Sequence, residues 1–279
     1  MTDIENINLD ESKHIVTIKD VAKVKPKKIS GTQFGVVLGV NTFSSPFQAW
    51  CDIMRVYKKP FFETTEILAG KQIEPLQAKY VKERFNLNGM KSPSDMYGEN
   101  YFKRTRGDFF PMDDYFQGMW DYINTDPQTG ATTAVIEMKT TKAEKRKYWE
   151  EQIPPYYVLQ NGLYAYLLKV NKMPIVASFL APGDYERPNT FVPDESNTII
   201  KAFTLEKDLP NFEEFYIKPA LEWREEHVLT GISPKYDEFN PEDVAIIKDL
   251  KAQLKAQEEK KAVHSFTIED VLKEESQFF

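Results

Sequence analysis

The segment Thr132–Thr141, which reads TTAVIEMKTT, constrains the fold more than any other part of the chain. It is rich in β-branched residues and follows the turn-forming run NTDPQTG, so it predicts the returning strand of a β-hairpin. Side chains alternate across a strand, and one alternate set is apolar: Ala134, Ile136 and Met138. Glu137 and Lys139 therefore share the opposite face, where two charges need a chemical reason or contact with solvent.

The other patterns along the chain predict a mixed α/β domain. We expect helices where apolar residues recur at helical spacing and strands where short apolar runs are bounded by turns. The predicted helices cover residues 29–39, 45–57, 64–85, 154–170, 209–229 and 241–261, and the predicted strands cover 114–123, 132–141, 174–181 and 197–205. Residues 86–108 read as a loop. Pro75 is expected either to kink its helix or to open a second one. This order suggests a mixed central sheet flanked by helices.

We divide the chain into three parts on these patterns. Residues 1–25 are polar without clear periodicity and are expected to form a partly ordered N-terminal arm. Residues 26–232 would form the main domain, and residues 233–279 an acidic, helical C-terminal extension that ends in a short amphipathic piece, 266–279.

Composition excludes several classes of protein. With 279 residues, 41% of them hydrophobic, the chain can bury a sizeable core. No apolar run approaches the roughly 18 residues of a spanning helix, and the acidic N-terminus lacks a signal-peptide core, so we expect no membrane contact and a cytoplasmic location. A single cysteine, Cys51, and three scattered histidines cannot build a zinc finger or an iron–sulfur cluster. A metal would be held by oxygen ligands, which favours Mg²⁺ or Mn²⁺.

The Glu-x-Lys pattern alone carries little information, because it recurs in the predicted arm and in the charged C-terminal helix, at Glu11/Lys13, Glu258/Lys260 and Glu259/Lys261. Only the Glu137 copy lies in a strand with an apolar opposite face. It also follows a strand that carries Asp121, and hairpin pairing would bring the two carboxylates side by side. Asp113 and Asp114 are alternative first acids. Two carboxylates and a lysine suit a divalent metal and the water it activates, whereas the competing interpretation is an edge strand with a charged solvent face.

An acid followed by Glu-x-Lys on a hairpin resembles the PD-(D/E)xK nuclease core, and further segments resemble its lambda-exonuclease-type, YqaJ-like viral recombinase group. AGKQIEPLQAKYVKERF is similar to that group's G-K-x-x-E helix, with Glu74 as the acid. ISGTQFGVVLG is similar to its N-terminal segment, with Ser30 and Thr32 at the hydroxyl positions. YYVLQNGLYAYLL is similar to the helix after Glu-x-Lys, with Gln160 at the glutamine. Two departures are Trp120, where the family has proline, and a longer turn before Glu137.

The resemblance implies a restriction-endonuclease-like fold and a set of residue roles. Asp121 and Glu137, with the Met138 carbonyl, would bind Mg²⁺, and Glu74 would complete the site. Lys139 would orient or deprotonate the attacking water, or stabilise the transition state, and Gln160 would join the active site. Ser30 and Thr32 would contact a DNA phosphate. Further basic residues are candidates for binding DNA: Lys27, Lys28, Lys142 and Arg146.

The same resemblance implies a Mg²⁺-dependent exonuclease that digests double-stranded DNA ends from 5′ to 3′ in phage-type recombination. It would form a ring-shaped homotrimer and work with a single-strand annealing protein, in the bacterial host cytoplasm if phage-encoded. Two alternatives remain open. One is another nuclease on the same core, either a restriction-like endonuclease or a Cas4-like enzyme without its cluster. The other is a non-catalytic DNA-binding protein that keeps the fold.

Overall fold

The computed structural model describes residues 1–41 and 43–275, with side chains up to residue 261. The chain divides into two compact units, which we call the sheet unit and the terminal unit. The sheet unit comprises residues 28–41 and 60–221, and the terminal unit comprises residues 1–27, 43–59 and those from 222 onward.

A five-stranded mixed sheet forms the centre of the sheet unit, in the order β4-β6-β7-β8-β9. Its strands are β4 (Met90–Lys91), β6 (Tyr122–Thr125), β7 (Thr132–Lys142), β8 (Ile175–Leu180) and β9 (Thr198–Lys201). β7 pairs antiparallel with β6 and parallel with β8. It is therefore an interior strand, and the competing interpretation of a solvent-facing edge strand is wrong.

The turn between β6 and β7 follows from its residues. The Asp126 side chain accepts hydrogen bonds from the amides of Gln128 and Thr129, each at 2.8 Å, and Gly130 adopts a φ of +71°. An aspartate that ties down the next amides and a glycine in the left-handed region are typical turn chemistry. Asp126 therefore serves the hairpin turn, as its sequence context predicts.

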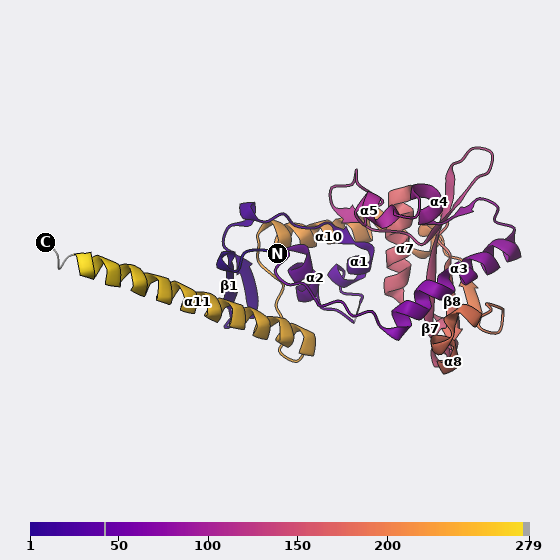
Figure 1. The fold of residues 1–279 in the computed structure, drawn as a ribbon. Helices are drawn as coiled ribbons and strands as arrows, with labels where there is room; N and C mark the ends of the chain where they lie inside the picture. The colour runs from indigo at the N-terminus through magenta and orange to yellow at the C-terminus, as the bar shows by residue number, and fades with distance from the viewer. Residues whose placement is uncertain (42, 276–279) are drawn as a thin grey trace. The chain divides into compact units, whose positions relative to one another are not determined.

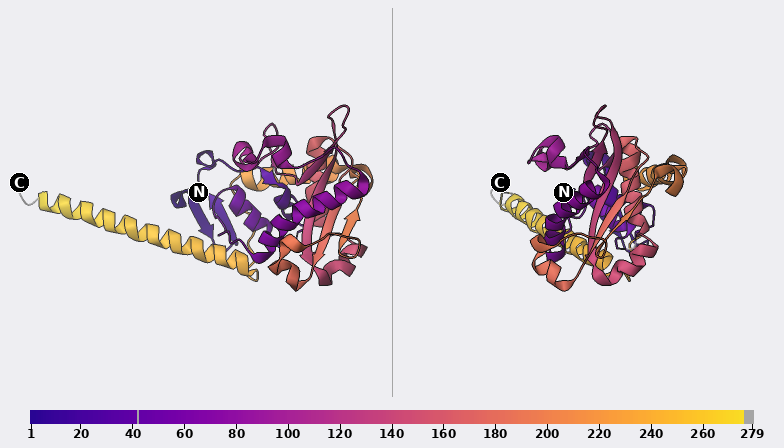
Figure 2. Two further views of the ribbon diagram at one scale, coloured as in Figure 1. Left: turned by 45° about the vertical axis from the view of Figure 1, so that its right-hand side comes forward. Right: turned by 90° about the vertical axis from the view of Figure 1, so that its right-hand side faces the viewer.

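Helices cover both faces of the sheet around β7. α3 (Thr65–Phe85) places Ala78 and Val81 in one apolar cluster with Ile136 and Met138 of β7. α7 (Pro155–Leu168) lies on the other face, where Gln160 meets Glu137. Figures 1 and 2 show α3 running across the strands β7 and β8. Ile136 and Met138 pack against α3 whereas Glu137 faces α7, which confirms the predicted alternation. The mixed sheet flanked by helices confirms the predicted fold class.

Several predicted elements have different bounds in the structure. Residues 86–108 are not a plain loop, because they contain β4, α4 (Pro93–Tyr97) and α5 (Tyr101–Thr105). The predicted strand 114–123 is divided into β5 (Phe116–Gln117) and β6. α3 continues through Pro75, so no second helix opens there. The predicted helix 209–229 consists of a π-helix over Glu213–Ile217, α10 (Lys218–Trp223) and a second π-helix over Arg224–Leu229.

The remaining elements of the sheet unit are short. α1 (Gly31–Val37) follows β3 (Ile29–Ser30), which pairs in parallel with β5. The others are α6 (Arg146–Glu151), α8 (Pro182–Glu186) and α9 (Leu205–Asp208). Ser30 closes a capping box with Gln33, which explains why α1 begins at Gly31.

The terminal unit is built around a hairpin and two helices. Residues 1–25, expected as a partly ordered arm, contain the antiparallel pair β1 (Ile7–Asp10) and β2 (Ile15–Ile18). These strands have four residues each, too few for alternation to stand out in the sequence. α2 (Pro46–Ile53) begins after Ser45 and contains the buried Cys51.

The C-terminal helix is longer than predicted. α11 (Pro241–Glu275) is one continuous helix, drawn in yellow in Figure 1, and it covers most of the expected amphipathic piece, whose residues 276–279 lie outside the described part. Asp243 near its start accepts hydrogen bonds from Ser45 and Gln48 of α2, at 2.7 and 2.6 Å. Across residues 1–41 and 43–275, no helix has both the length and the apolar character of a membrane span.

Candidate active site

Glu137 is the centre of a polar cluster inside the sheet unit. Its side chain is only 1% exposed. The Oε1 atom accepts hydrogen bonds from the Lys139 ammonium and, at 2.6 Å, from the Gln160 amide on α7. The Oε2 atom is also buried but has no hydrogen-bond partner among the described residues. A buried carboxylate oxygen without a donor is costly, so this atom is a place where a ligand would lower the free energy.

Asp121 lies next to Glu137 because of the register of the hairpin. Tyr122 pairs with Ile136, so the residue before Tyr122 falls alongside the residue after Ile136. The Asp121 Oδ2 atom accepts a hydrogen bond from the Met138 amide at 2.8 Å. The two carboxylates predicted from the hairpin pattern are thus neighbours. The alternative acid Asp113 instead accepts hydrogen bonds from the amides of Tyr115 and Phe116, at 2.8 and 2.6 Å.

Glu74 reaches the same cluster from α3. Gln77, three residues further along the helix, donates hydrogen bonds to the Lys139 carbonyl at 2.8 Å and to Ser178 Oγ at 2.9 Å. These two bonds fix α3 against β7 and β8. Burial, together with the charges of Asp121 and Glu137, raises the pKa of Glu74 to about 8.

The cluster places the carboxyl groups of Glu74, Asp121 and Glu137 around the Lys139 ammonium. Burial and the neighbouring Asp121 raise the pKa of Glu137 to about 7, and burial also raises the pKa of Asp121. Burial lowers the pKa of Lys139, but the carboxylates of Glu137 and Asp121 outweigh it and hold that pKa well above its ordinary value. The Lys139 ammonium also lies 4.8 Å from the centre of the Tyr157 ring. Lys139 is therefore a cation that neutralises part of the acidic charge.

The donor set suits a hard divalent cation, because it consists of carboxylate oxygens and includes one buried oxygen without a partner. Within the described residues, however, no three His, Cys, Asp or Glu side chains gather closely enough to form a cage by themselves. Asp121 turns one oxygen to the Met138 amide, and Lys139 occupies one oxygen of Glu137. A metal site formed by Glu137, Asp121 and Glu74 therefore stays a prediction.

The predicted phosphate-binding hydroxyls lie at the start of α1. Ser30 Oγ accepts a hydrogen bond from the Gln33 amide at 3.3 Å and lies 3.1 Å from Thr32 Oγ1, whereas Thr32 is exposed. Between them, Gly31 packs directly against the ring and hydroxyl of Tyr164 on α7. This contact brings the start of α1 to within one helical turn of Gln160. A phosphate contact at Ser30 and Thr32 stays a prediction.

Three of the four predicted DNA-binding cations are already engaged within the protein. In the terminal unit, Lys27 pairs with Asp52 at 2.5 Å. In the sheet unit, Lys28 pairs with Asp108 at 2.7 Å, and Arg146 pairs with Glu150 at 2.7 Å and donates to the carbonyls of Ser196 and Glu195.

Lys142 is exposed and makes none of the ion pairs that join the described residues. Of the four cations, it is the one placed to meet a ligand without first breaking an ion pair.

Tyr164 is a residue of the cluster that the sequence did not single out. Its pKa is raised because the ring is buried, and the charges of Glu137 and Asp121 add to that effect. The hydroxyl is hydrogen-bonded to the Met119 amide and to the Gln160 side chain. A Cβ atom on Gly31 or Gly118 would overlap this ring. The two glycines were the available signal, since a glycine outside a turn often marks a close approach.

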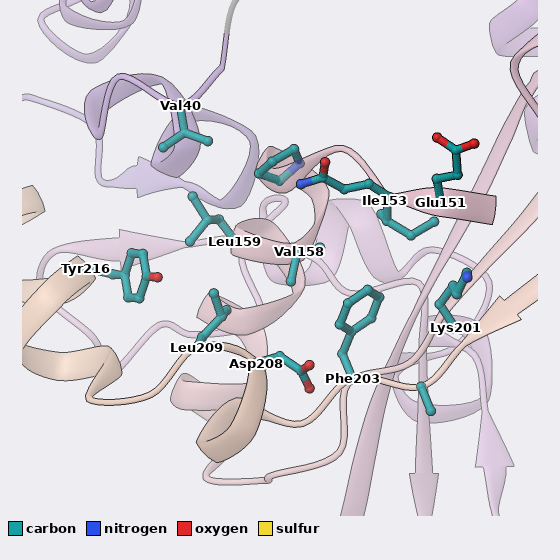
Figure 3. A pocket seen from close by; sticks show the side chains of 13 residues that line it. Val40, Glu151, Ile153, Val158, Leu159, Lys201, Phe203, Asp208, Leu209 and Tyr216 are labelled. Carbon is teal, nitrogen blue, oxygen red and sulfur yellow. The ribbon is translucent and has the colours of Figure 1, made fainter. Parts of the chain in front are cut away.

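A pocket of the sheet unit, shown in Figure 3, is separate from this cluster. It has a volume of about 450 Å³ and is lined mainly by apolar side chains, among them Val40, Val158, Leu159, Phe203 and Leu209. None of the three acids lines it. α7 thus presents Val158 and Leu159 to the pocket and Gln160 to Glu137.

A first acid before one strand and Glu-x-Lys on the next, in a mixed sheet flanked by helices, define the core of the PD-(D/E)xK class. This chain belongs to the family of YqaJ-like viral recombinase domains, whose model matches residues 21–167.

Two relatives from mycoplasmas resemble the chain over most of its length. "Uncharacterized protein MG373" of Mycoplasma genitalium is 30% identical, over 76% of this chain and 84% of that protein. The "Uncharacterized protein MG373 homolog" of Mycoplasma pneumoniae is 26% identical, over 75% and 83%.

Two solved structures resemble the fold at low identity. An alkaline exonuclease from Laribacter hongkongensis has a TM-score of 0.45 and 12% identity, covering 84% of this chain and 93% of that one. A phage-related exonuclease from Haemophilus somnus has a TM-score of 0.48 and 10% identity, covering 74% and 96%.

Proposed function

We propose that this protein is a metal-dependent deoxyribonuclease that hydrolyses phosphodiester bonds at the ends of duplex DNA. One observation carries the proposal: the buried Glu137 has one oxygen held by Lys139 and Gln160 and the other without a partner, with Asp121 beside it. A buried carboxylate oxygen without a donor is costly, and a bound cation would remove that cost. Membership of the YqaJ-like viral recombinase domain family supports the same conclusion.

Asp121, Glu137 and Glu74 would hold Mg²⁺ or Mn²⁺, with the Met138 carbonyl as a further oxygen. The bound ion would supply an acidified water and neutralise charge on the phosphate. Gln160 orients Glu137 by its 2.6 Å hydrogen bond, and Gln77 holds the β7 backbone at Lys139. The protein residues thus fix the ligands before DNA arrives.

For Lys139 we favour the role of a cation that stabilises the developing negative charge. Its pKa is held above the ordinary value by Glu137 and Asp121, so it carries its proton in the free protein. An ammonium that is only 20% exposed interacts more strongly with a phosphate than an exposed one does. Deprotonation of the water by Lys139 would first require another cation to offset both carboxylates.

The decisive experiment compares Lys139→Ala with Lys207→Ala, an exposed lysine on α9 that lies outside the cluster. Linear and covalently closed duplex DNA, labelled at each 5′ or 3′ end, is incubated with Mg²⁺, Mn²⁺ or a chelator. We expect the unchanged protein and Lys207→Ala to digest linear DNA only when metal is present. Lys139→Ala should lose about 100-fold or more of the rate while still binding DNA ends.

Each other outcome has a definite meaning. Undiminished cleavage by Lys139→Ala would refute the proposed site. Digestion of closed circles would favour the restriction-like endonuclease. Binding of DNA with no cleavage under any metal condition would favour the non-catalytic alternative. Early loss of the 5′ label would support 5′-to-3′ digestion, whereas early loss of the 3′ label would contradict it.

A role in phage-type recombination, a ring-shaped trimer and a single-strand annealing partner extend the proposal. They rest on the family alone. Light scattering of the purified protein would measure the oligomer, since a trimer has three times the 32.4 kDa mass of one chain.

A further inference from the structure

The acids of the candidate site create a difficulty for a DNA-cutting protein. Glu74, Asp121 and Glu137 face one lysine, and the whole chain has a net charge of −7. A DNA phosphate that approaches this site meets repulsion unless other cations lie nearby. Lys28 and Arg146, expected to supply that charge, are bound to acids of the protein.

Three cations on α5 and at the residue directly after it are not neutralised in this way. Lys103, Arg104 and Arg106 are exposed, and in the described part of the chain no carboxylate pairs with any of them. Arg104 donates one hydrogen bond to the Tyr97 carbonyl at 3.0 Å, which steadies its guanidinium and leaves its charge uncompensated. No acid occurs in the sequence from Tyr101 to Arg106.

A stack of aromatic rings connects α5 to the candidate site. The rings of Tyr97 and Phe109 lie 4.9 Å apart, and those of Phe109 and Trp120 lie 4.8 Å apart. Tyr101, the first residue of α5, packs on the same Phe109 at 6.2 Å. Trp120 directly precedes Asp121, so these ring contacts end at the residue next to a proposed metal ligand. Figure 1 shows α4 and α5 next to each other in this part of the fold.

Electrostatics give a second sign that α5 is close to the acids. Burial raises the pKa of Tyr101, and the carboxylates of Glu74 and Asp121 raise it further. Tyr101, at the start of α5, therefore lies close enough to Glu74 and Asp121 for their charges to affect its pKa.

We propose that Lys103, Arg104 and Arg106, which we call the α5 basic surface, bind the backbone phosphates of DNA beside the active site. This inference rests on the proposed function and adds the surface that holds the substrate. Fixed cations on an aromatic support would offset the repulsion from the acids and hold the strand while one phosphate enters the cluster.

The test measures binding separately from cleavage. One variant combines Lys103→Gln, Arg104→Gln and Arg106→Asn; asparagine is chosen because residue 106 has a φ of +57°, which asparagine tolerates. The matched control combines Lys172→Gln, Lys207→Gln and Lys235→Gln, three exposed lysines on segments that contribute no side chain to the site. Binding of a labelled blunt-ended duplex is followed in chelator, over a range of salt concentrations.

We expect the α5 variant to bind about tenfold or more weakly, and its plot of log affinity against log salt to be less steep by about 2 to 3. The control should stay within about twofold of the unchanged protein. An unchanged salt slope for the α5 variant would overturn the inference, whatever the cleavage result. Failure of the unchanged protein to cleave DNA with either metal would refute the proposed function instead, even if the α5 variant lost binding.

Discussion

The side-chain amide of Gln160 donates a hydrogen bond to Oε1 of Glu137 across 2.6 Å, joining α7 to the central strand of the sheet. The same oxygen is contacted by Lys139, so two donors fix the carboxylate in one orientation. Removing Gln160 should release that orientation without removing a proposed metal ligand. We expect Gln160→Leu to lower kcat and metal affinity by about 10- to 100-fold, the usual effect of losing a residue that orients a ligand.

Steady-state rates over a range of Mg²⁺ concentrations would measure this effect. Asn161, the next residue on α7, is a suitable comparison because it bonds to the carbonyls of Met173 and Pro174 rather than to Glu137. Asn161→Ala should lower stability and leave the metal dependence of the rate unchanged. If Gln160→Leu behaved like Asn161→Ala, Gln160 would be a structural residue only.

The sequence predicted those parts of the fold that depend on local patterns. The alternation in β7 and the turn at Asp126 follow from neighbouring residues, and both are present in the structure. The hairpin β1–β2 and the short helices α4 and α5 were missed because four or five residues carry too little periodicity.

The sequence predicted the part of the candidate site that lies on the β6–β7 hairpin. The register of β6 and β7 places Asp121 beside Glu137, as hairpin pairing suggested. The approach of Gln160 and Glu74 depends on how α7 and α3 pack, and the sequence supplied this only through a family resemblance. The ion pairs of Lys28 and Arg146 depend on partners 80 and 4 residues away, and a sequence that shows a charge does not show which charges are already neutralised.

Gly31 allows the ring of Tyr164 to lie against the start of α1. A Cβ atom at this position would overlap the Tyr164 hydroxyl and ring, so either α1 or α7 would have to shift. We expect Gly31→Ala to cost about 1 to 3 kcal/mol of unfolding free energy and to slow cleavage, because Tyr164 bonds to Gln160. Gly183→Ala is the control, since its Cβ would meet open space. Urea denaturation would compare the two, and equal stabilities would show that α1 adjusts freely.

Variants of Ser30 and Thr32 would distinguish a role in helix capping from a role in phosphate binding. Ser30 caps α1, so Ser30→Ala should cost about 1 kcal/mol of unfolding free energy. Thr32 is exposed, so Thr32→Val should leave the stability within about 0.5 kcal/mol of the unchanged protein. If the hydroxyls bind a DNA phosphate, Thr32→Val will also weaken DNA binding several-fold in chelator. Unchanged affinity for Thr32→Val would show that Thr32 does not bind a DNA phosphate.

Glu74 should make the metal-free protein less stable as the pH rises. Burial, with Asp121 and Glu137 nearby, raises its pKa from 4.5 to about 8, so the folded state binds this proton more tightly than the unfolded state. The stabilisation is therefore complete below about pH 4.5 and is lost as the pH rises toward 8. In chelator we expect the unfolding free energy to fall by up to about 5 kcal/mol across this window, and Glu74→Gln to flatten the fall. A profile that Glu74→Gln leaves unchanged would mean that Glu74 is not held among the other acids.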